Sequence, residues 1–418
     1  MKKKIYFELL ILLILGALTS FSLPPYNFFL INFIFFSFFF IILFKRKKLP
    51  FKNKPFLYGW LFGFGYFLTN LYWISISLSF DENFKFLIPF TLILIPAFLA
   101  IFYGLVTYIF FKINIKKPLS NLFLFVLLFG FVEFLRGTIL TGFPWNLIAF
   151  SFSNNLAIIQ VISLIGTYAF NILCITFFTI PAIFILKESK KEFFISIIFL
   201  LLPFVLFFYG SNKIQSFQSL KVIENDYVIR AVGSKINLNR FYGNVDSATV
   251  IEELIELSDP DFDKKTLFLW PEGIIPNVNQ NELKEFGYIF NQNFNENHLL
   301  VIGINSFRID NNKDKFYNSF SIYDHKLKLV HSYDKIKLVP FGEFLPLEKI
   351  LSKIGLKSLT NNYQSFSSGE NREIIKIDEN DFNIKILPLI CYEIIYSGKI
   401  FDNTDFDYII NISEDGWF

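Results

Sequence analysis

The sequence contains few of the residues that hold metal ions or form disulfide bonds, with two cysteines and three histidines among 418 residues. Cys174 lies in an apolar run and Cys391 lies in a polar region, so we expect no disulfide between them. No histidine stands at a zinc-type spacing from either cysteine. A disulfide-stapled domain and a zinc module are therefore excluded, and we expect neither a metal ion nor another cofactor.

Charge is also scarce, since Asp, Glu, Lys and Arg make up 18% of the residues and the net charge is only +3. This balance does not favour binding to nucleic acid. Apolar residues are abundant instead, at 53% of the chain, and the mean hydropathy is +0.46. Because long uncharged runs fill residues 1–210, we expect a membrane domain over 1–212 and a polar domain, with a core of its own, over 221–418.

Seven apolar segments can each supply the ~20 residues that cross a bilayer. The first follows Met1 and three lysines like a signal peptide, but it has no small-residue cleavage site and further spans follow it, so we expect a helix. These segments predict seven transmembrane helices, at about 5–21, 28–44, 56–78, 86–111, 120–138, 157–186 and 193–209.

Basic residues mark alternate connections between the predicted spans. They precede the first span and follow the second, fourth and sixth, whereas the other connections contain few Lys or Arg residues. This positive-inside pattern predicts a cytoplasmic N-terminus. Seven spans then place residues 221–418 on the outer face, which is the periplasm if the protein resides in a bacterial inner membrane.

Four residues in the membrane domain allow more than one interpretation. Glu133 and Arg136 lie three residues apart near the end of the fifth span. They would form either an interfacial ion pair or a functional pair. Trp73 and Trp145 lie near the predicted outer face, in an aromatic belt or in contact with a substrate. Few other charges lie in the spans, which argues against a transporter.

The polar domain alternates strand-like and helix-like stretches, a pattern typical of α/β folds. Residues 244–258 and 283–295 have helical spacing. The predicted strands cover residues 227–232, 266–270, 299–304, 316–323, 327–333, 384–391 and 408–412.

Three reactive side chains stand at strand ends or in a rigid turn. Glu272 follows Trp-Pro at the end of one strand, Lys335 lies in a stretch rich in Pro and Gly, and Cys391 ends another strand. A free thiol is mostly protonated at neutral pH, so a nucleophilic Cys391 needs a base such as Glu272. The Lys335 ammonium would favour both the thiolate and an oxyanion. Each residue taken alone is ordinary as a buried thiol, a loop acid or a surface lysine, and only their combination predicts catalysis.

These motifs also resemble a known family. WPEG at 270–273, YDKIKLVPFGEFLP at 333–346 and ICYE at 390–393 are similar to the Glu-Lys-Cys signature of the nitrilase, or carbon-nitrogen hydrolase, superfamily. The element LVPFGE resembles the apolipoprotein N-acyltransferase branch. LPPYN at 23–27 and LRGTILTGFPWN at 135–146 resemble the membrane domain of that branch. The resemblance implies a membrane α-helical bundle joined to a nitrilase-like αββα sandwich.

The resemblance further implies a two-step acyl transfer. Cys391 would take an acyl chain from a phospholipid, typically phosphatidylethanolamine, and pass it to the α-amine of the diacylglyceryl-cysteine that begins an apolipoprotein. Glu272 would be the base and acid, and Lys335 would stabilise the oxyanions. Supporting or substrate-binding roles would belong to Glu343, Tyr392 and Glu393.

The sequence departs from the family pattern at two places. Phe241 stands where the family has a tryptophan linked to activity. The motif NISEDGWF at 411–418 belongs well inside the family's catalytic domain, so we expect that domain, and an eighth span after it, to be incomplete here. Two alternative functions remain open, a membrane-anchored amidase or nitrilase in which water accepts the acyl group, and an inactive truncated membrane scaffold.

Overall fold

The structure is a computed structural model, and it divides into two compact units, Met1–Lys221 and Val222–Phe418. Each unit is described by itself. The described residues are 2–48, 54–80, 82–221, 225–233, 245–310, 312–346, 365–379, 381–401, 403–414 and 416.

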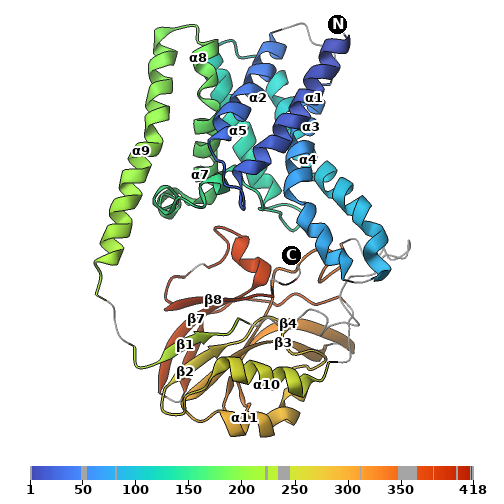
Figure 1. The fold of residues 1–418 in the computed structure, drawn as a ribbon, viewed down its shortest axis with the longest axis vertical. Helices are drawn as coiled ribbons and strands as arrows, with labels where there is room; N and C mark the ends of the chain where they lie inside the picture. The colour runs from blue at the N-terminus through green and yellow to red at the C-terminus, as the bar shows by residue number, and fades with distance from the viewer. Residues whose placement is uncertain are drawn as a thin grey trace. The chain divides into compact units, whose positions relative to one another are not determined.

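The first unit is built of α-helices joined by short 3-10 turns (Figure 1). Its α-helices are α1 (Lys2–Thr19), α2 (Ile31–Lys47), α3 (Pro55–Asn70), α4 (Ile88–Lys112), α5 (Pro118–Arg136), α6 (Leu156–Ile159), α7 (Ile162–Thr179), α8 (Ala182–Leu186) and α9 (Lys190–Gln218). Its 3-10 turns are η1 (Ser20–Ser22), η2 (Tyr72–Ser79), η3 (Glu82–Leu87) and η4 (Ile148–Phe152).

Five helices among the described residues are long and apolar enough to cross a membrane, and six if the bent pair α3 and η2 is one span. Of the seven predicted spans, the one over 157–186 consists of α6, α7 and α8, and of these only α7 is long enough. The predicted segment 28–44 corresponds to α2, whose 17 residues extend about 25 Å. The protein is a multi-pass membrane protein, while the number of seven spans and their orientation stay predictions.

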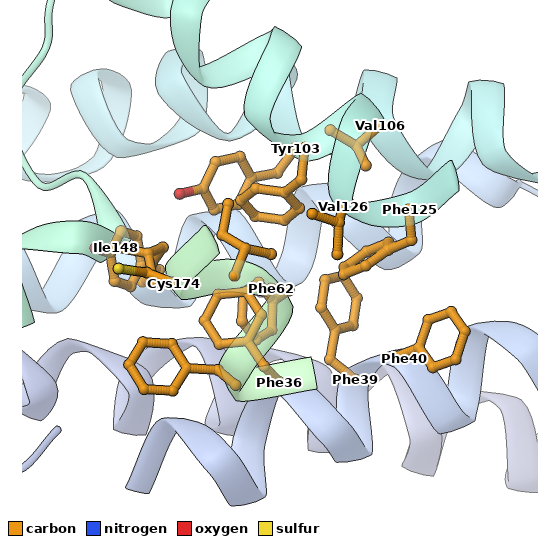
Figure 2. Packing of buried hydrophobic residues seen from close by; sticks show 14 of the residues in the cluster. Phe36, Phe39, Phe40, Phe62, Tyr103, Val106, Phe125, Val126, Ile148 and Cys174 are labelled. Carbon is orange, nitrogen blue, oxygen red and sulfur yellow. The ribbon is translucent and has the colours of Figure 1, made fainter. Parts of the chain in front are cut away.

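Phenylalanine rings fill the core of the first unit (Figure 2). The ring of Phe39 stacks on that of Phe62 with centroids 4.1 Å apart, and Phe125 meets Phe39 edge-on at 5.6 Å. Helices α3 and α4 approach closely because Gly59 has no side chain. A Cβ atom there would lie 2.0 Å from the carbonyl oxygen of Tyr103. The abundant Phe residues therefore have a structural use as packing between helices.

The ion pair between Glu133 and Arg136 lies in the interior of this unit, with both side chains fully buried. Arg136 Nη1 donates hydrogen bonds to the carbonyl oxygens of Phe143, at 2.6 Å, and Trp145, at 2.8 Å. The pair therefore fastens the loop that follows α5, while its position relative to the membrane interface stays a prediction. The ring of Trp145 meets that of Trp73 at 5.8 Å.

The second unit contains two sheets. The first has the order β1-β2-β3-β4-β5, with β1, β2 and β3 parallel and the others antiparallel. The second has the order β6-β7-β8. Their bounds are β1 (Val228–Ala231), β2 (Thr266–Leu269), β3 (His298–Asp310), β4 (Lys313–Asp324), β5 (Leu329–Asp334), β6 (Ile375–Glu379), β7 (Phe382–Ile390) and β8 (Tyr408–Ile412).

Helices α10 (Ser247–Ser258) and α11 (Gly287–Asn293) pack on the first sheet through one apolar cluster (Figure 1). A second cluster joins the two sheets, with Val301 and Phe320 of the first sheet meeting Ile384 and Ile410 of the second. The described residues thus form a helix layer and two sheet layers of the expected sandwich. The described residues of this unit also include two short 3-10 turns, η6 (Glu282–Phe286) and η8 (Cys391–Ile395).

Candidate active site

Glu272 lies in a turn just beyond the carboxyl end of β2. Trp270 holds the start of this turn, because its side chain is fully buried and its Nε1 donates to Ser258 Oγ at 2.9 Å. Gly303 on the neighbouring strand β3 leaves room for the turn. A Cβ atom at Gly303 would lie 2.5 Å from the Cα atom of Glu272 and from the carbonyl oxygen of Pro271. The position of Glu272 therefore depends on a glycine of another strand.

Lys335 follows β5 directly and is buried, with 1% of its side chain exposed. Its backbone N–H donates to the carbonyl oxygen of Asn318 on β4 at 2.8 Å. Its Nζ donates to Oε1 of Glu272 at 3.0 Å and to Oε1 of Glu343 at 2.9 Å. One ammonium thus joins two carboxylates that lie far apart in the sequence.

These two carboxylates keep the Lys335 amine protonated. Burial by itself lowers the pKa of its amine, but the charges of Glu272 and Glu343 outweigh burial and raise the pKa above its ordinary value. Lys335 is therefore an ammonium throughout the physiological range. Since Nζ carries three hydrogens and directs two of them at the carboxylates, a third is available for another acceptor.

Cys391 directly follows β7, which ends at Ile390 and not at Cys391 as predicted. It begins the turn η8 with a backbone φ of +49°, which is strained for a residue other than glycine. Burial and the charge of Glu272 raise the pKa of its thiol to about 12, although Lys335 and a hydrogen bond with Ser413 act in the opposite direction. The resting group is therefore the protonated thiol. Such a thiol would act as a nucleophile only if a base removed its proton during attack.

Glu393 fastens the Cys391 turn to the Lys335 segment. Its carboxylate is 1% exposed and accepts the hydroxyl of Tyr333 at 2.8 Å. It pairs with Arg372 at 2.8 Å. Burial and the charge of Glu393 raise the pKa of Tyr333, which stays a donor. The carboxylate also accepts three backbone N–H groups, from Ile336 at 2.9 Å, Lys337 at 3.1 Å and Ile390 at 3.0 Å.

The structure brings Glu272, Lys335 and Glu343 into direct contact, and the Cys391 thiol responds to the charges of all three. Tyr392 and Glu393 follow Cys391 in η8 and make other contacts. Glu393 acts through the backbone. The ring of Tyr392 packs edge-on against that of Tyr396, with centroids 5.2 Å apart. Phe241 lies outside the described residues.

Three residues of the site were not predicted from the sequence. Asn318 Nδ2 donates to Oε1 of Glu272 at 2.6 Å and to Oε1 of Glu343 at 2.9 Å. Gly303 and Ser413 are the other two. A glycine inside an apolar strand is a signal for close backbone approach, and it was available for Gly303. No pattern in the sequence marked Asn318.

Within the described part of the chain, no group of three or more His, Cys, Asp or Glu side chains is arranged to hold a metal ion. His298 is buried in a structural setting, with Nε2 at 2.9 Å from the carbonyl oxygen of Asp261 and Nδ1 accepting the Asn295 N–H at 3.2 Å. The described charged side chains in contact at the site are the carboxylates of Glu272 and Glu343 and the ammonium of Lys335.

Comparison with known proteins gives two matching families. The apolipoprotein N-acyltransferase N-terminal domain matches residues 15–180, and carbon-nitrogen hydrolase matches residues 267–418. The fold and these matches define a carbon-nitrogen hydrolase domain in a multi-pass bacterial membrane protein.

Individual relatives share both domains. Apolipoprotein N-acyltransferases of Rhizobium etli (strain CIAT 652) and Brucella melitensis are 28% and 27% identical, each over 96% of this chain and 77% of the relative. The corresponding enzyme of Rhodopseudomonas palustris is 28% identical over 98% of this chain and 78% of the relative. The chain thus resembles apolipoprotein N-acyltransferases over 96% of its length, with the N-terminal domain of that family followed by a carbon-nitrogen hydrolase domain.

Proposed function

We propose that this protein N-acylates the diacylglyceryl-cysteine at the start of apolipoproteins, with a phospholipid as the acyl donor. One observation carries the proposal. A protonated, partly buried Cys391 thiol lies within electrostatic reach of Glu272 and Lys335, in a chain that apolipoprotein N-acyltransferases match over 96% of its length.

In the first half-reaction the Cys391 sulfur bonds to the ester carbonyl carbon of the phospholipid, phosphatidylethanolamine by resemblance. Glu272 takes the thiol proton as the sulfur attacks, because the raised pKa of the thiol leaves almost no thiolate at rest. The tetrahedral intermediate then breaks its bond to the glycerol oxygen. Glu272 returns the proton to that oxygen, and a lysophospholipid leaves the thioacyl-enzyme.

In the second half-reaction the α-amine of the apolipoprotein attacks the thioester carbon. Glu272 takes a proton from the amine and gives it to the departing sulfur of Cys391. An amide forms and the thiol is restored. The two half-reactions follow a ping-pong order and require no cofactor.

Lys335 has the right charge and position to stabilise the oxyanion of both intermediates. Two of its hydrogens bind Glu272 and Glu343, and the third would bind the oxyanion. The backbone N–H of Tyr392, next to the nucleophile, is proposed as the second donor. Glu343 also accepts the backbone N–H of Val339 at 2.8 Å, a geometry that suits orientation of Lys335.

The membrane setting suits these substrates, because both carry acyl chains that stay in a bilayer. We assign the protein to the bacterial inner membrane, with a cytoplasmic N-terminus and a periplasmic catalytic domain, from the basic residues in alternate connections.

The proposal is tested by acyl transfer from phosphatidylethanolamine to a synthetic diacylglyceryl-cysteine peptide, with the protein in detergent or vesicles. Cys391→Ala, Glu272→Gln and Lys335→Met should each reduce the rate by at least about a hundredfold. Cys174→Ala is the matched control, since it removes the other thiol. Release of free fatty acid without amide formation would instead establish a hydrolase, and equal rates for Cys391→Ala and the parent would reject the nucleophile.

A further inference from the structure

Asn318 closes a ring of hydrogen bonds at the site. Its Nδ2 and the Nζ of Lys335 donate to the same two oxygens, Oε1 of Glu272 and Oε1 of Glu343, at distances between 2.6 and 3.0 Å. The backbone carbonyl of Asn318 also accepts the Lys335 N–H. A single residue on β4 therefore binds the base, the backbone of Lys335 and the second carboxylate.

This ring makes the two oxygens of Glu272 unequal. Oε1 accepts two hydrogen bonds, one from an amide and one from an ammonium. Oε2 accepts the backbone N–H of Glu414 at a longer distance of 3.3 Å. A carboxylate oxygen that already accepts two strong donors is a poor proton acceptor, so Oε2, with one longer hydrogen bond, is the better proton acceptor of the two.

The amide of Asn318 is not explained by stability alone. The residue is 6% exposed, and its Oδ1 has no hydrogen-bond partner among the described residues. A buried polar atom without a partner destabilises the folded state. A side chain that carries this cost while its Nδ2 binds two carboxylates is better explained by its effect on those carboxylates.

We propose that Asn318 is a positioning residue that holds Glu272 through Oε1 and leaves Oε2 to exchange protons with Cys391 and the substrates. The inference rests on the proposed function and adds a determinant of its pH dependence. A donor to a carboxylate favours the charged form, so loss of Asn318 Nδ2 must favour the protonated form.

The first test measures Cys391 acylation, as lysophospholipid release in a single turnover, from pH 5 to 9. Asn318→Leu removes the donor and Asn318→Asp replaces it with a third carboxylate. Both should move the acid limb of the rate to higher pH by about one unit or more. Asn291→Asp is the control, since it makes the same change of charge at an exposed position on α11 and should leave the limb in place.

A second readout needs no substrate. A protonated Glu272 carboxyl gives an infrared band that is identified by its absence from Glu272→Gln. This band should appear at a higher pH in Asn318→Leu than in the parent. If the rate falls equally at every pH and this band does not move, Asn318 has only a structural role and the inference is overturned. If the parent protein never acylates Cys391 but the band does move, the proposed function fails while the inference about Asn318 and Glu272 holds.

Discussion

At the scale of single residues, the proposed chemistry depends on a nucleophile that is kept uncharged. Cys391 is held in a strained backbone conformation at a strand end, and burial together with the charge of Glu272 raises the pKa of its thiol to about 12. A permanent thiolate would react with any electrophile that reached it. A thiol that loses its proton only to Glu272 during attack reacts with a substrate that is already in place.

The raised pKa of Cys391 predicts an unusual alkylation profile. In a Cys174→Ala background, the rate of reaction with iodoacetamide should rise about tenfold per pH unit from pH 7 to 10 without levelling. An ordinary thiol would level off near its pKa of about 8.5. Glu272→Gln removes the charge that raises the pKa of Cys391, so this variant should be alkylated faster at pH 9 although it loses acyl transfer.

This prediction separates the electrostatic role of Glu272 from general damage to the site. A plateau below pH 9 in the parent protein would contradict the raised pKa of Cys391. Slower alkylation of Glu272→Gln would show that Glu272 does not act on the thiol through its charge.

At the scale of elements, the site is assembled from turns and segments that neighbouring strands hold in place. Gly303 of β3 admits the backbone of the Glu272 turn, and Asn318 of β4 binds the backbone of Lys335. Glu393 joins the segment after Lys335 to the end of β7 through three backbone N–H groups. Residues of β3, β4 and η8 thus hold the backbone around the three proposed catalytic side chains.

Gly303→Ala should therefore impair activity without abolishing the fold. The added methyl group would lie 2.5 Å from the Cα atom of Glu272, so this backbone must shift. A displacement of about 1 Å at a catalytic group costs about a hundredfold in rate, and we expect a loss of that order in acyl transfer. Gly287→Ala on α11 is the control, because nothing lies within 4 Å of its Cβ position. Equal rates for the two variants would contradict the importance of this contact.

The sequence predicted the elements that its apolar patterns mark. Strands β2 and β7 are apolar runs cut off by polar residues, so their ends, and with them Glu272 and Cys391, were predictable. Strand β6 was missed, although Ile375 and Ile377 alternate with polar residues there. Asn318 was not predictable, because its role depends on the strands that β4 pairs with and on groups distant in sequence.

In the membrane segments too, the sequence predicted the apolar elements but not features that depend on packing. Hydropathy located the apolar helices but not their breaks, because a broken helix has the same composition as a straight one. Gly166 has a φ of +78° inside α7, and the segment predicted as one span over 157–186 is divided into three helices. Residue spacing did place Glu133 and Arg136 as a pair, but burial of that pair depends on helix packing.

At the scale of the whole molecule, one chain joins a helical unit packed with Phe side chains to a carbon-nitrogen hydrolase domain. A hydrolase that acts on small soluble amides has no need of several membrane helices. An enzyme whose donor and acceptor both carry acyl chains does need them, because neither substrate leaves the bilayer. The composition of the whole chain therefore supports the acyl-transfer proposal as much as the site does.

The most direct test of the central claim is the mass of the Cys391 peptide after purification of the protein with phospholipid. We predict an added mass equal to a fatty acyl group, absent from Cys391→Ala and removed when a diacylglyceryl-cysteine peptide is supplied. An acyl group that water removes at the same rate with and without the peptide would contradict the transferase. An unmodified Cys391 in protein that has turned over the donor would contradict the thioacyl-enzyme itself.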